Sequence, residues 1–172
     1  CIGDDRSMVY CSQIIHPSIT VTSIDTSPSF SPVLIPGAPI SAISAGESHS
    51  CALTDPGSVW CWKNDFIKGN AYFPMEVISG DENSAISVIS GDETSCSILQ
   101  DRAVSCWEYN TIDSKSPKDG GFDFVLSGPI FQIPASSIAM GNDFICSIGV
   151  DSTVSCLGNI SVNSEINHSC ED

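Results

Sequence analysis

The chain has 172 residues, which is enough for one domain with a sizeable core. Its 21 acidic and 6 basic residues give a formal net charge of −15 at pH 7. Because nucleic acid phosphates select surfaces rich in Lys and Arg, this charge argues against nucleic acid as a partner. It permits a basic protein, a cationic peptide or a bound cation, although a solubilising acidic surface is the simpler interpretation.

No stretch of the sequence approaches the roughly 20 apolar residues of a membrane span, and no signal peptide is visible. The chain begins at Cys1, in the middle of a repeat. We therefore expect it to be a fragment or a processed chain, with any membrane anchor in a segment outside it.

Eight of the nine cysteines form four pairs with one spacing: Cys1/Cys11, Cys51/Cys61, Cys96/Cys106 and Cys146/Cys156. Zinc ligands usually lie closer together, with about two to four residues between them, and often include histidine. The three histidines, His16, His49 and His168, do not recur with the cysteines. We therefore predict one disulfide for each pair, no metal or cofactor, and an oxidising extracellular or cell-surface compartment.

The first copy of the repeat, residues 1–12, predicts a hairpin from Cys1 to Cys11. The segment 12–40 is rich in proline and serine, which is typical of loops and edge positions. Within it, residues 19–24 alternate and are β-branched, so we predict a strand there.

The second copy, residues 43–62, reads ISAGESHSCALTDPGSVWCW. Its residues 55–58, Asp-Pro-Gly-Ser, predict a turn between two strands. A polar loop with aromatic residues follows at 63–74, and residues 75–78 predict a short strand.

The third and fourth copies span residues 88–107 and 138–157. A very polar loop follows the third copy at 109–123, and we expect short strands at 124–126 and 130–133. No segment has a convincing helical period of apolar residues, so the sequence predicts an all-β chain.

The copies share a glycine five residues before the first cysteine and a valine eight residues after it. The glycines are Gly46, Gly91 and Gly141, and the valines are Val9, Val59, Val104 and Val154. We expect each glycine to permit a tight turn or a positive φ between two strands.

The spacing of the second copy predicts a stapled hairpin. Residues two apart in a strand share a face, so a turn near Pro56 sets Cys51 opposite Cys61. It also sets Leu53 opposite Val59, and the arrangement makes a cross-strand disulfide plausible. The opposite face carries Trp60 and Trp62, so both faces are apolar and the sheet must be covered on both sides.

The copies recur after about 45 to 50 residues, with three recognisable strands and an expected fourth in the loop. Four-stranded sheets packed face to face around an axis form a β-propeller. The pattern Ile/Val-x-x-Gly, Cys-x-Leu/Ile and Val-x-Cys-Trp resembles the regulator-of-chromosome-condensation repeat. It is most similar to the disulfide-bearing form in the ectodomains of plant crinkly-type receptor kinases.

The resemblance implies one propeller domain, residues 1–172, with about four blades and one cross-strand disulfide in each. The family's propellers have seven blades, so we expect the remaining blades in residues outside this chain. A second chain that completes the ring, or a small ring that closes by itself, are the alternatives. The departures from the pattern are Lys63 and Glu108, which follow Cys-Trp where the family usually has glycine, and Leu157, which replaces the tryptophan.

The same resemblance implies an extracellular, non-catalytic module of a receptor kinase or receptor-like protein that binds a protein or peptide ligand. A kinase domain could stand elsewhere in a longer chain. The alternative is a secreted stand-alone propeller that acts as a lectin-like binder or a protein inhibitor. A cytosolic or nuclear exchange factor conflicts with the paired cysteines and the acidic charge.

Signs of an enzyme are weak. Residues 46–50, Gly-Glu-Ser-His-Ser, lack the second glycine and the strand-to-helix context of a nucleophile elbow. His49 is therefore expected to be a turn residue rather than a general base. The carboxylates at 80–82 and 91–93 lack calcium-loop spacing and predict solvated turns. Trp60, Trp62 and Trp107 could stack on a sugar, but core packing is the expectation.

Several surface features remain candidates. Asn159 and Asn167 begin N-glycosylation sequons. Cys170 could begin a fifth copy at 162–170, close the last blade, or form an intermolecular bridge. A partner surface is expected first in loops 63–74 and 109–123, whose candidate contact residues are Phe66, Lys68, Tyr72, Tyr109, Lys115 and Lys118.

Overall fold

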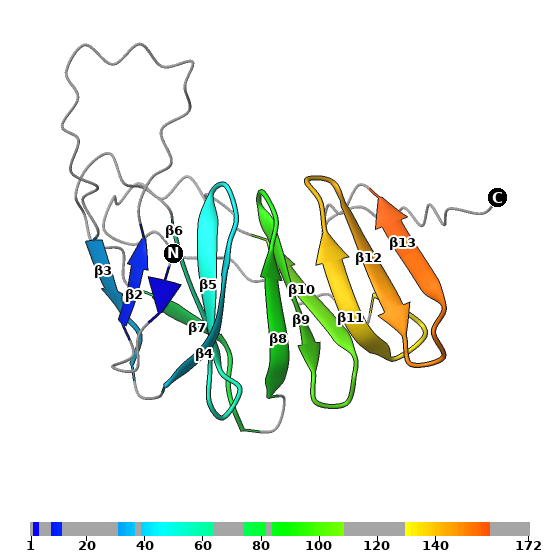
Figure 1. Ribbon diagram of the computed structural model, residues 1–172, viewed down its shortest axis with the longest axis horizontal. Coiled ribbons are helices and arrows are strands. Elements are labelled where there is room, and N and C mark those ends of the chain that lie inside the picture. The colour runs from blue at the N-terminus through cyan, green and yellow to red at the C-terminus, as the bar shows by residue number, and fades with distance from the viewer. Residues whose placement is uncertain are drawn as a thin grey trace, which may run out of the picture.

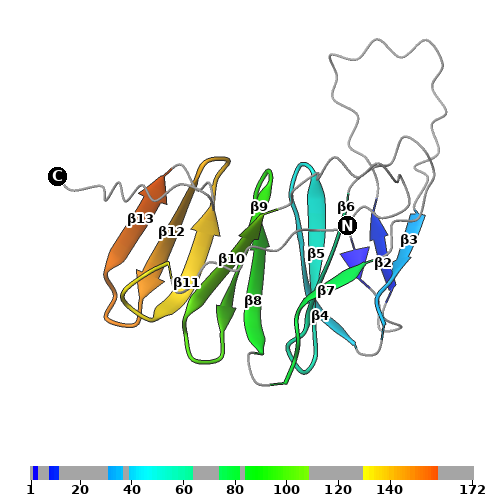
Figure 2. The same ribbon diagram turned by 180° about the vertical axis from the view of Figure 1, so that it is seen from behind.

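The computed structural model of the chain describes residues 2–3, 8–11, 31–36, 39–63, 74–81, 84–108 and 130–158. All regular structure in these ranges is β-strand, which confirms the all-β prediction. The strands form four antiparallel sheets, which stand side by side in the order of the sequence (Figure 1). Figure 2 shows the same row from behind. The described ranges contain no helix that could cross a membrane.

We number the sheets first to fourth along the chain. The first contains β1 (Ile2–Gly3), β2 (Met8–Cys11) and β3 (Ser31–Leu34). The second contains β4 (Ile40–Ala45), β5 (His49–Thr54), β6 (Val59–Lys63) and β7 (Met75–Ile78). The third contains β8 (Ala85–Ser90), β9 (Thr94–Leu99) and β10 (Val104–Glu108). The fourth contains β11 (Ala135–Met140), β12 (Phe144–Gly149) and β13 (Val154–Gly158).

The register of each hairpin follows from the cysteine spacing. Cys51 lies opposite Cys61, and Leu53 lies opposite Val59, as predicted. The third and fourth sheets repeat this register, with Cys96 opposite Cys106 and Cys146 opposite Cys156. In the first sheet Ile2 pairs with Tyr10 and Gly3 with Val9, which confirms the predicted first hairpin.

The short segments between the repeats agree only in part with expectation. Residues 75–78 form β7, an outer strand of the second sheet, as predicted. Residues 130–133, predicted as a strand, instead form a bend that ends at Pro134, and the buried Phe131 packs in the core there. Proline cannot donate to a strand ladder, which accounts for the break. The strands expected at 19–24 and 124–126 lie outside the described residues.

The core consists of apolar layers between successive sheets, not of one central cluster. The layer between the first two sheets contains Ile35, Ala52 and Trp62. The next contains Cys51, Leu53, Val59, Cys61, Ile78, Ala85 and Trp107. The third contains Cys96, Ile98, Val104, Cys106, Phe131, Ala135 and Ile145. The second and third sheets are therefore covered on both faces, as expected for sheets whose two faces are both apolar.

Candidate functional site

Three cross-strand disulfides repeat at one position of successive sheets. They join Cys51 to Cys61, Cys96 to Cys106, and Cys146 to Cys156, with Cα–Cα distances of 4.1, 4.0 and 4.0 Å. These agree with the predicted fold of one cross-strand disulfide per blade for three of the four blades. Cys1 lies outside the described residues, so its disulfide with Cys11 stays a prediction.

Each of the first two disulfides is covered by the next sheet. Trp107, 0% exposed, lies in the same apolar layer as the Cys51–Cys61 disulfide. Leu157 packs at the corresponding place against the layer that contains Cys96 and Cys106. The residue that follows the second cysteine of one sheet therefore packs in the apolar layer that holds the disulfide of the sheet before it.

The tryptophans are mainly core residues. Trp62 is 2% exposed and packs with Ile35 and Ala52, whereas Trp60 is half-buried beside them. Among the described residues, the Nε1 atoms of Trp62 and Trp107 have no hydrogen-bond partner. Burial removes Trp62 and Trp107 as stacking platforms for a sugar, because a ligand would need to reach the ring face.

His49 joins the second sheet to the third. It begins strand β5 and is 0% exposed, so the expectation of a turn residue is wrong: the turn consists of Glu47 and Ser48. Its Nε2 lies 2.5 Å from Oγ of Ser95 on β9, and its Nδ1 lies 3.1 Å from Oγ of Ser48. The Ser48 hydroxyl in turn donates to the carbonyl oxygen of Asp92 at 2.5 Å. A polar chain thus crosses the interface between two sheets.

The same surroundings keep His49 neutral. Burial lowers the pKa of His49 to about 4, and this is opposed only in part by a hydrogen bond to the Asp92 backbone and by the Asp92 charge. Its partner Ser95 is also 0% exposed. An imidazole enclosed with a buried hydroxyl has no path to an external substrate, so this pair acts as a structural link.

The repeated glycines are explained by close packing between sheets. Gly46 donates its N–H to the carbonyl oxygen of His49 at 2.9 Å and closes a tight two-residue turn, as one of the two expectations had it. None of Gly46, Gly91 and Gly141 has a positive φ, so that alternative is wrong. A Cβ added at Gly46 would lie 1.8 Å from the carbonyl oxygen of Gly91, and one at Gly91 would lie 2.7 Å from Sδ of Met140. In the second sheet the glycine is therefore needed because of the backbone of the sheet that follows, whereas at Gly91 the close neighbour is the flexible Met140 side chain of the following sheet.

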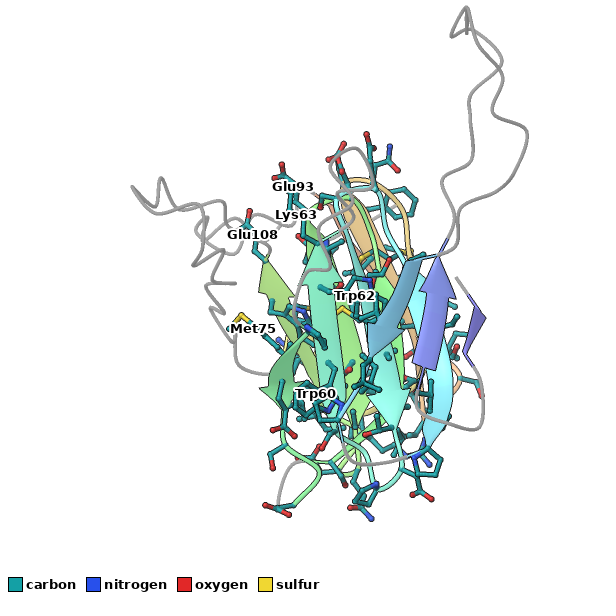
Figure 3. All side chains as sticks on the ribbon, turned by 90° about the vertical axis from the view of Figure 1, so that its left-hand side faces the viewer. Trp60, Trp62, Lys63, Met75, Glu93 and Glu108 are labelled. Carbon is teal, nitrogen blue, oxygen red and sulfur yellow. A yellow bond between two sulfur atoms is a disulfide. The ribbon has the colours of Figure 1, made fainter. Side chains whose placement is uncertain are left out.

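The long insertions leave the sheets from one edge. Strands β6, β10 and β13 end at Lys63, Glu108 and Gly158, which pair with the first residues of β5, β9 and β12. The two-residue turns 47–48, 92–93 and 142–143 lie beside those first residues, and we call this end of the sheets the loop edge. Figure 3 shows Lys63, Glu93 and Glu108 at this edge. The sequence analysis did not identify this shared origin, although the equal spacing of the strands in each copy implies that the loops start at the same edge.

The carboxylates of the turns do not form a metal site in the described ranges. Asp81 and Glu93 are exposed and Asp92 is half-buried, all three in turns. The described part of the chain holds no group of three His, Cys, Asp or Glu residues that could bind a metal ion. The expected contact residues Phe66, Lys68, Tyr72, Tyr109, Lys115 and Lys118 lie outside the described residues, as do Asn159, Asn167 and Cys170.

Comparison with known sequences supports the repeat. Residues 40–62 match the sequence model of the regulator of chromosome condensation (RCC1) repeat. This stretch covers the second copy with its glycine, both cysteines and its tryptophans. No match was found among curated proteins.

Solved structures resemble the chain in fold at low sequence identity. Human WBSCR16 is 14% identical with a TM-score of 0.56, and the likeness covers 79% of this chain and 38% of that one. Yeast RCC1, the Prp20p protein of Saccharomyces cerevisiae that binds Gsp1p and histones, is 18% identical with a TM-score of 0.54, over 74% and 35%. The ectodomain of the Physcomitrella patens receptor kinase CR4 is 17% identical over 72% and 28%, but its TM-score of 0.45 is too low to support an argument.

These likenesses establish the fold. The chain is a partial, propeller-like array of antiparallel sheets with RCC1-type repeat features, and its sheets are from here on called blades. It spans less than two fifths of the length of the first structures it resembles.

Proposed function

We propose that this chain is part of an extracellular, non-catalytic propeller that binds a protein or peptide partner, within a receptor kinase or a receptor-like protein. The observation that carries the proposal is the common origin of the long insertions at the loop edge. Segments 64–73 and 109–129 begin at the ends of β6 and β10. These two strands belong to neighbouring blades, which pack against each other through one apolar layer. Loops on one edge of a rigid scaffold are a common way to build a single binding face.

The described charges at the loop edge favour a basic partner. The turns there carry Glu47, Asp92, Glu93 and Asp143, and Glu108 ends β10 nearby. Lys63 is the one basic residue among the described residues at these turns and strand ends. An acidic rim raises the local concentration of a cationic peptide and speeds its association at low salt.

The disulfides favour the compartment that we propose. Two of the three described disulfides are fully buried between blades, so the folded protein contains these cysteines in the oxidised form. Disulfides of this kind form and persist mainly in secreted and cell-surface proteins. Free thiols at these positions in protein isolated from its natural source would contradict the proposed compartment.

The experiment is a comparison of loop variants. The chain would be immobilised and exposed to the extracellular proteins of its source tissue, and retained proteins identified by mass spectrometry. We expect alanine blocks at Phe66/Lys68/Tyr72 or Tyr109/Lys115/Lys118 to abolish retention of a specific protein. Alanine at Asp55 and Gln132, which are exposed in the described structure away from the loop edge, is the matched control. Retention that survives both loop blocks would rule out these loops as the binding face.

The alternative is a secreted stand-alone propeller, either a lectin-like binder or a protein inhibitor. A glycan array separates the lectin from both protein-binding functions. Recovery of the natural protein from the soluble extracellular fraction, without a membrane-bound form, would favour the secreted protein over the receptor.

A further inference from the structure

A continuous chain of polar side chains joins the second and third blades at the loop edge. Nε2 of His49 on β5 lies 2.5 Å from Oγ of Ser95 on β9, and the Ser95 hydroxyl donates to Oγ of Ser90 on β8 at 2.9 Å. The N–H of Ser90 in turn donates to Oγ of Ser44 on β4 at 2.8 Å. Together with the turn residues on the other side of the imidazole, these residues form what we call the polar lock: Ser44, Ser48, His49, Ser90, Asp92 and Ser95.

The polar lock lies beside the bases of the two long insertions. His49 pairs with Lys63, which ends β6, and the first insertion follows it. Ser95 lies one residue along β9 from the partner of Glu108, which ends β10, and the second insertion follows that residue. Figure 3 shows Lys63 and Glu108 at the same edge. The lock therefore joins the strands from which both insertions leave.

The polar lock cannot recur at the next interface. Counted from the repeated glycine and the first cysteine, Met140 and Ile145 of the fourth blade stand at the positions of Ser90 and Ser95. Neither side chain has a hydroxyl, and both pack in the apolar layer between the third and fourth blades. Thr94 stands in the third blade at the position of His49. The interface between the second and third blades thus has a chemistry of its own at this edge.

Directional and apolar contacts fix different things. Apolar cores lose their unique arrangement before they lose stability, whereas a hydrogen bond weakens steeply below about 120°. A buried polar group that loses its partner is also costly, so an arrangement that satisfies the whole chain is favoured over shifted ones. The apolar layer between the third and fourth blades holds two blades together without such a chain. The polar lock therefore serves position rather than cohesion.

We propose that the polar lock fixes the bases of the two insertions relative to each other, so that the insertions form one preorganised binding face. Its members are positioning residues, because His49 and Ser95 are 0% exposed and cannot themselves touch a partner. A face that is fixed before binding loses less conformational entropy when the partner binds. The binding part of this inference rests on the proposed function, whereas the fixed geometry does not.

The test compares two amides at the two ends of strand β8. The N–H of Ser90 donates into the polar lock, and the N–H of Ala85 donates to the carbonyl oxygen of Gly57 at the opposite edge, 2.8 Å away. Both hydrogen bonds cross the interface between the second and third blades. Native-state hydrogen exchange of the whole oxidised chain, followed for each residue by NMR, measures the opening of each edge separately.

Ser95→Ala removes a hydroxyl from the polar lock, and Ser97→Ala is the matched control. Ser97 is also 0% exposed on the same face of β9, and its hydroxyl has no partner among the described residues. We expect Ser95→Ala to speed exchange at Ser90 at least about tenfold, which corresponds to one buried hydrogen bond, and to leave Ala85 within about twofold. Ser97→Ala should change neither rate. Equal acceleration at Ser90 and Ala85, or equal effects of the two variants, would overturn the proposal.

Ser48→Ala guards against a folding defect. Ser48 is half-buried in the turn before β5, so its replacement removes a hydrogen bond of the polar lock without opening the core. We expect this variant to speed exchange at Ser90 and to spare Ala85. Exchange at Ser90 that stays unchanged in both Ser48→Ala and Ser95→Ala would show that the polar lock does not hold this edge.

The binding arm uses the purified protein that the immobilised chain retains from the extracellular extract. We expect Ser95→Ala to weaken its affinity at least about tenfold, and Ser97→Ala to leave it unchanged, as measured by surface plasmon resonance. Unchanged affinity in Ser95→Ala, with accelerated exchange at Ser90, would overturn the preorganised face and leave the proposed function intact. Accelerated exchange at Ser90 with no protein retained by the wild type would overturn the proposed function and leave the fixed geometry in place.

Discussion

Trp107 shows what a single residue contributes at a blade interface. Its ring is fully buried in the apolar layer that contains the Cys51–Cys61 disulfide, and its N–H has no partner among the described residues. The ring therefore acts through its apolar volume alone. Leu157 takes the equivalent position in the next blade, where no indole is present.

We therefore expect Trp107→Ala to lower the free energy of unfolding by about 3–5 kcal/mol, because it leaves a cavity over the disulfide. Trp107→Leu should cost clearly less, because Leu157 serves in the same place and no hydrogen bond is lost. Urea titrations of the oxidised protein would measure both. Equal losses for the two variants would contradict a role through volume.

His49 makes a pH-dependent contribution. Its pKa is about 4 in the folded chain and 6.5 as an unperturbed group. Above pH 6.5 the imidazole is neutral in both states, and the contribution is fully present. Between pH 6.5 and 4 only the unfolded state takes up the proton, so stability falls by up to about 1.4 kcal/mol per pH unit.

The expected measurement is the difference in unfolding free energy between the wild type and His49→Gln, followed from pH 7.5 to 4.5. The variant lacks this titration, so the difference should shrink as the pH falls. The comparison cancels the many carboxylates that titrate below about pH 5 in both proteins. A difference that stays constant would show that His49 has the same pKa in the folded and unfolded chain, as an exposed imidazole would.

At the scale of the element, the second turn of the second, third and fourth blades holds a residue with a positive φ. Gly57 has a φ of 115°, and Arg102 and Ser152, at the same position of the later copies, each have 71°. Glycine adopts this region freely, whereas other residues are strained there. The second blade thus has the suitable residue, and the other two do not.

Replacing Arg102 with glycine should therefore stabilise the protein by about 0.5–1 kcal/mol, since relief of strain exceeds the entropy lost by a more flexible unfolded chain. Ala103→Gly, next to it and without a positive φ, is the control and should destabilise. Thermal unfolding of the two variants gives the comparison. A loss of stability with Arg102→Gly would mean that the side chain matters more than the turn.

Each disulfide closes a short loop in the unfolded chain. Removing the Cys146–Cys156 pair by double alanine substitution should cost about 3 kcal/mol from loop entropy alone, because this pair is half-exposed. Removing Cys51 and Cys61 should cost more, because two buried sulfur atoms under Trp107 are lost as well. Denaturation of both double variants checks the order, and a larger loss at the outer pair would reverse our account of the interface.

At the scale of the whole molecule, the predictable part is what lies within one copy. Cysteine spacing and the period of two were enough for the register of Cys51 with Cys61 and for the all-β fold. The contacts between copies could not be predicted in this way. The reason for Gly46 is a carbonyl 45 residues later, at Gly91, and the burial of His49 depends on Ser95. Single-copy reasoning therefore left a tight turn and a positive φ as alternatives for the glycine, and it expected a turn at the histidine.

The segments between the repeats were predicted less well. Residues 75–78, Met-Glu-Val-Ile, form a strand, whereas residues 130–133 lie just before Pro134 and form a bend that places Phe131 in the core. The strand was predicted from apolar residues alone, but the segment crosses from one blade to the next, and Phe131 is buried in the layer between them. The apolar content of the two segments could not distinguish the strand from the bend.

The layered core has a consequence for how the molecule opens. Each apolar layer joins only two successive blades, so the chain is a short one-dimensional array whose stability is a sum over neighbours. An end member of such an array has one partner instead of two and opens at a lower free energy. Amide hydrogens of β12 and β13 should therefore exchange with solvent before those of β5 and β9. In such an array, covering the exposed face of β12 and β13 that carries Ile148 and Val154 would raise protection first in the fourth blade.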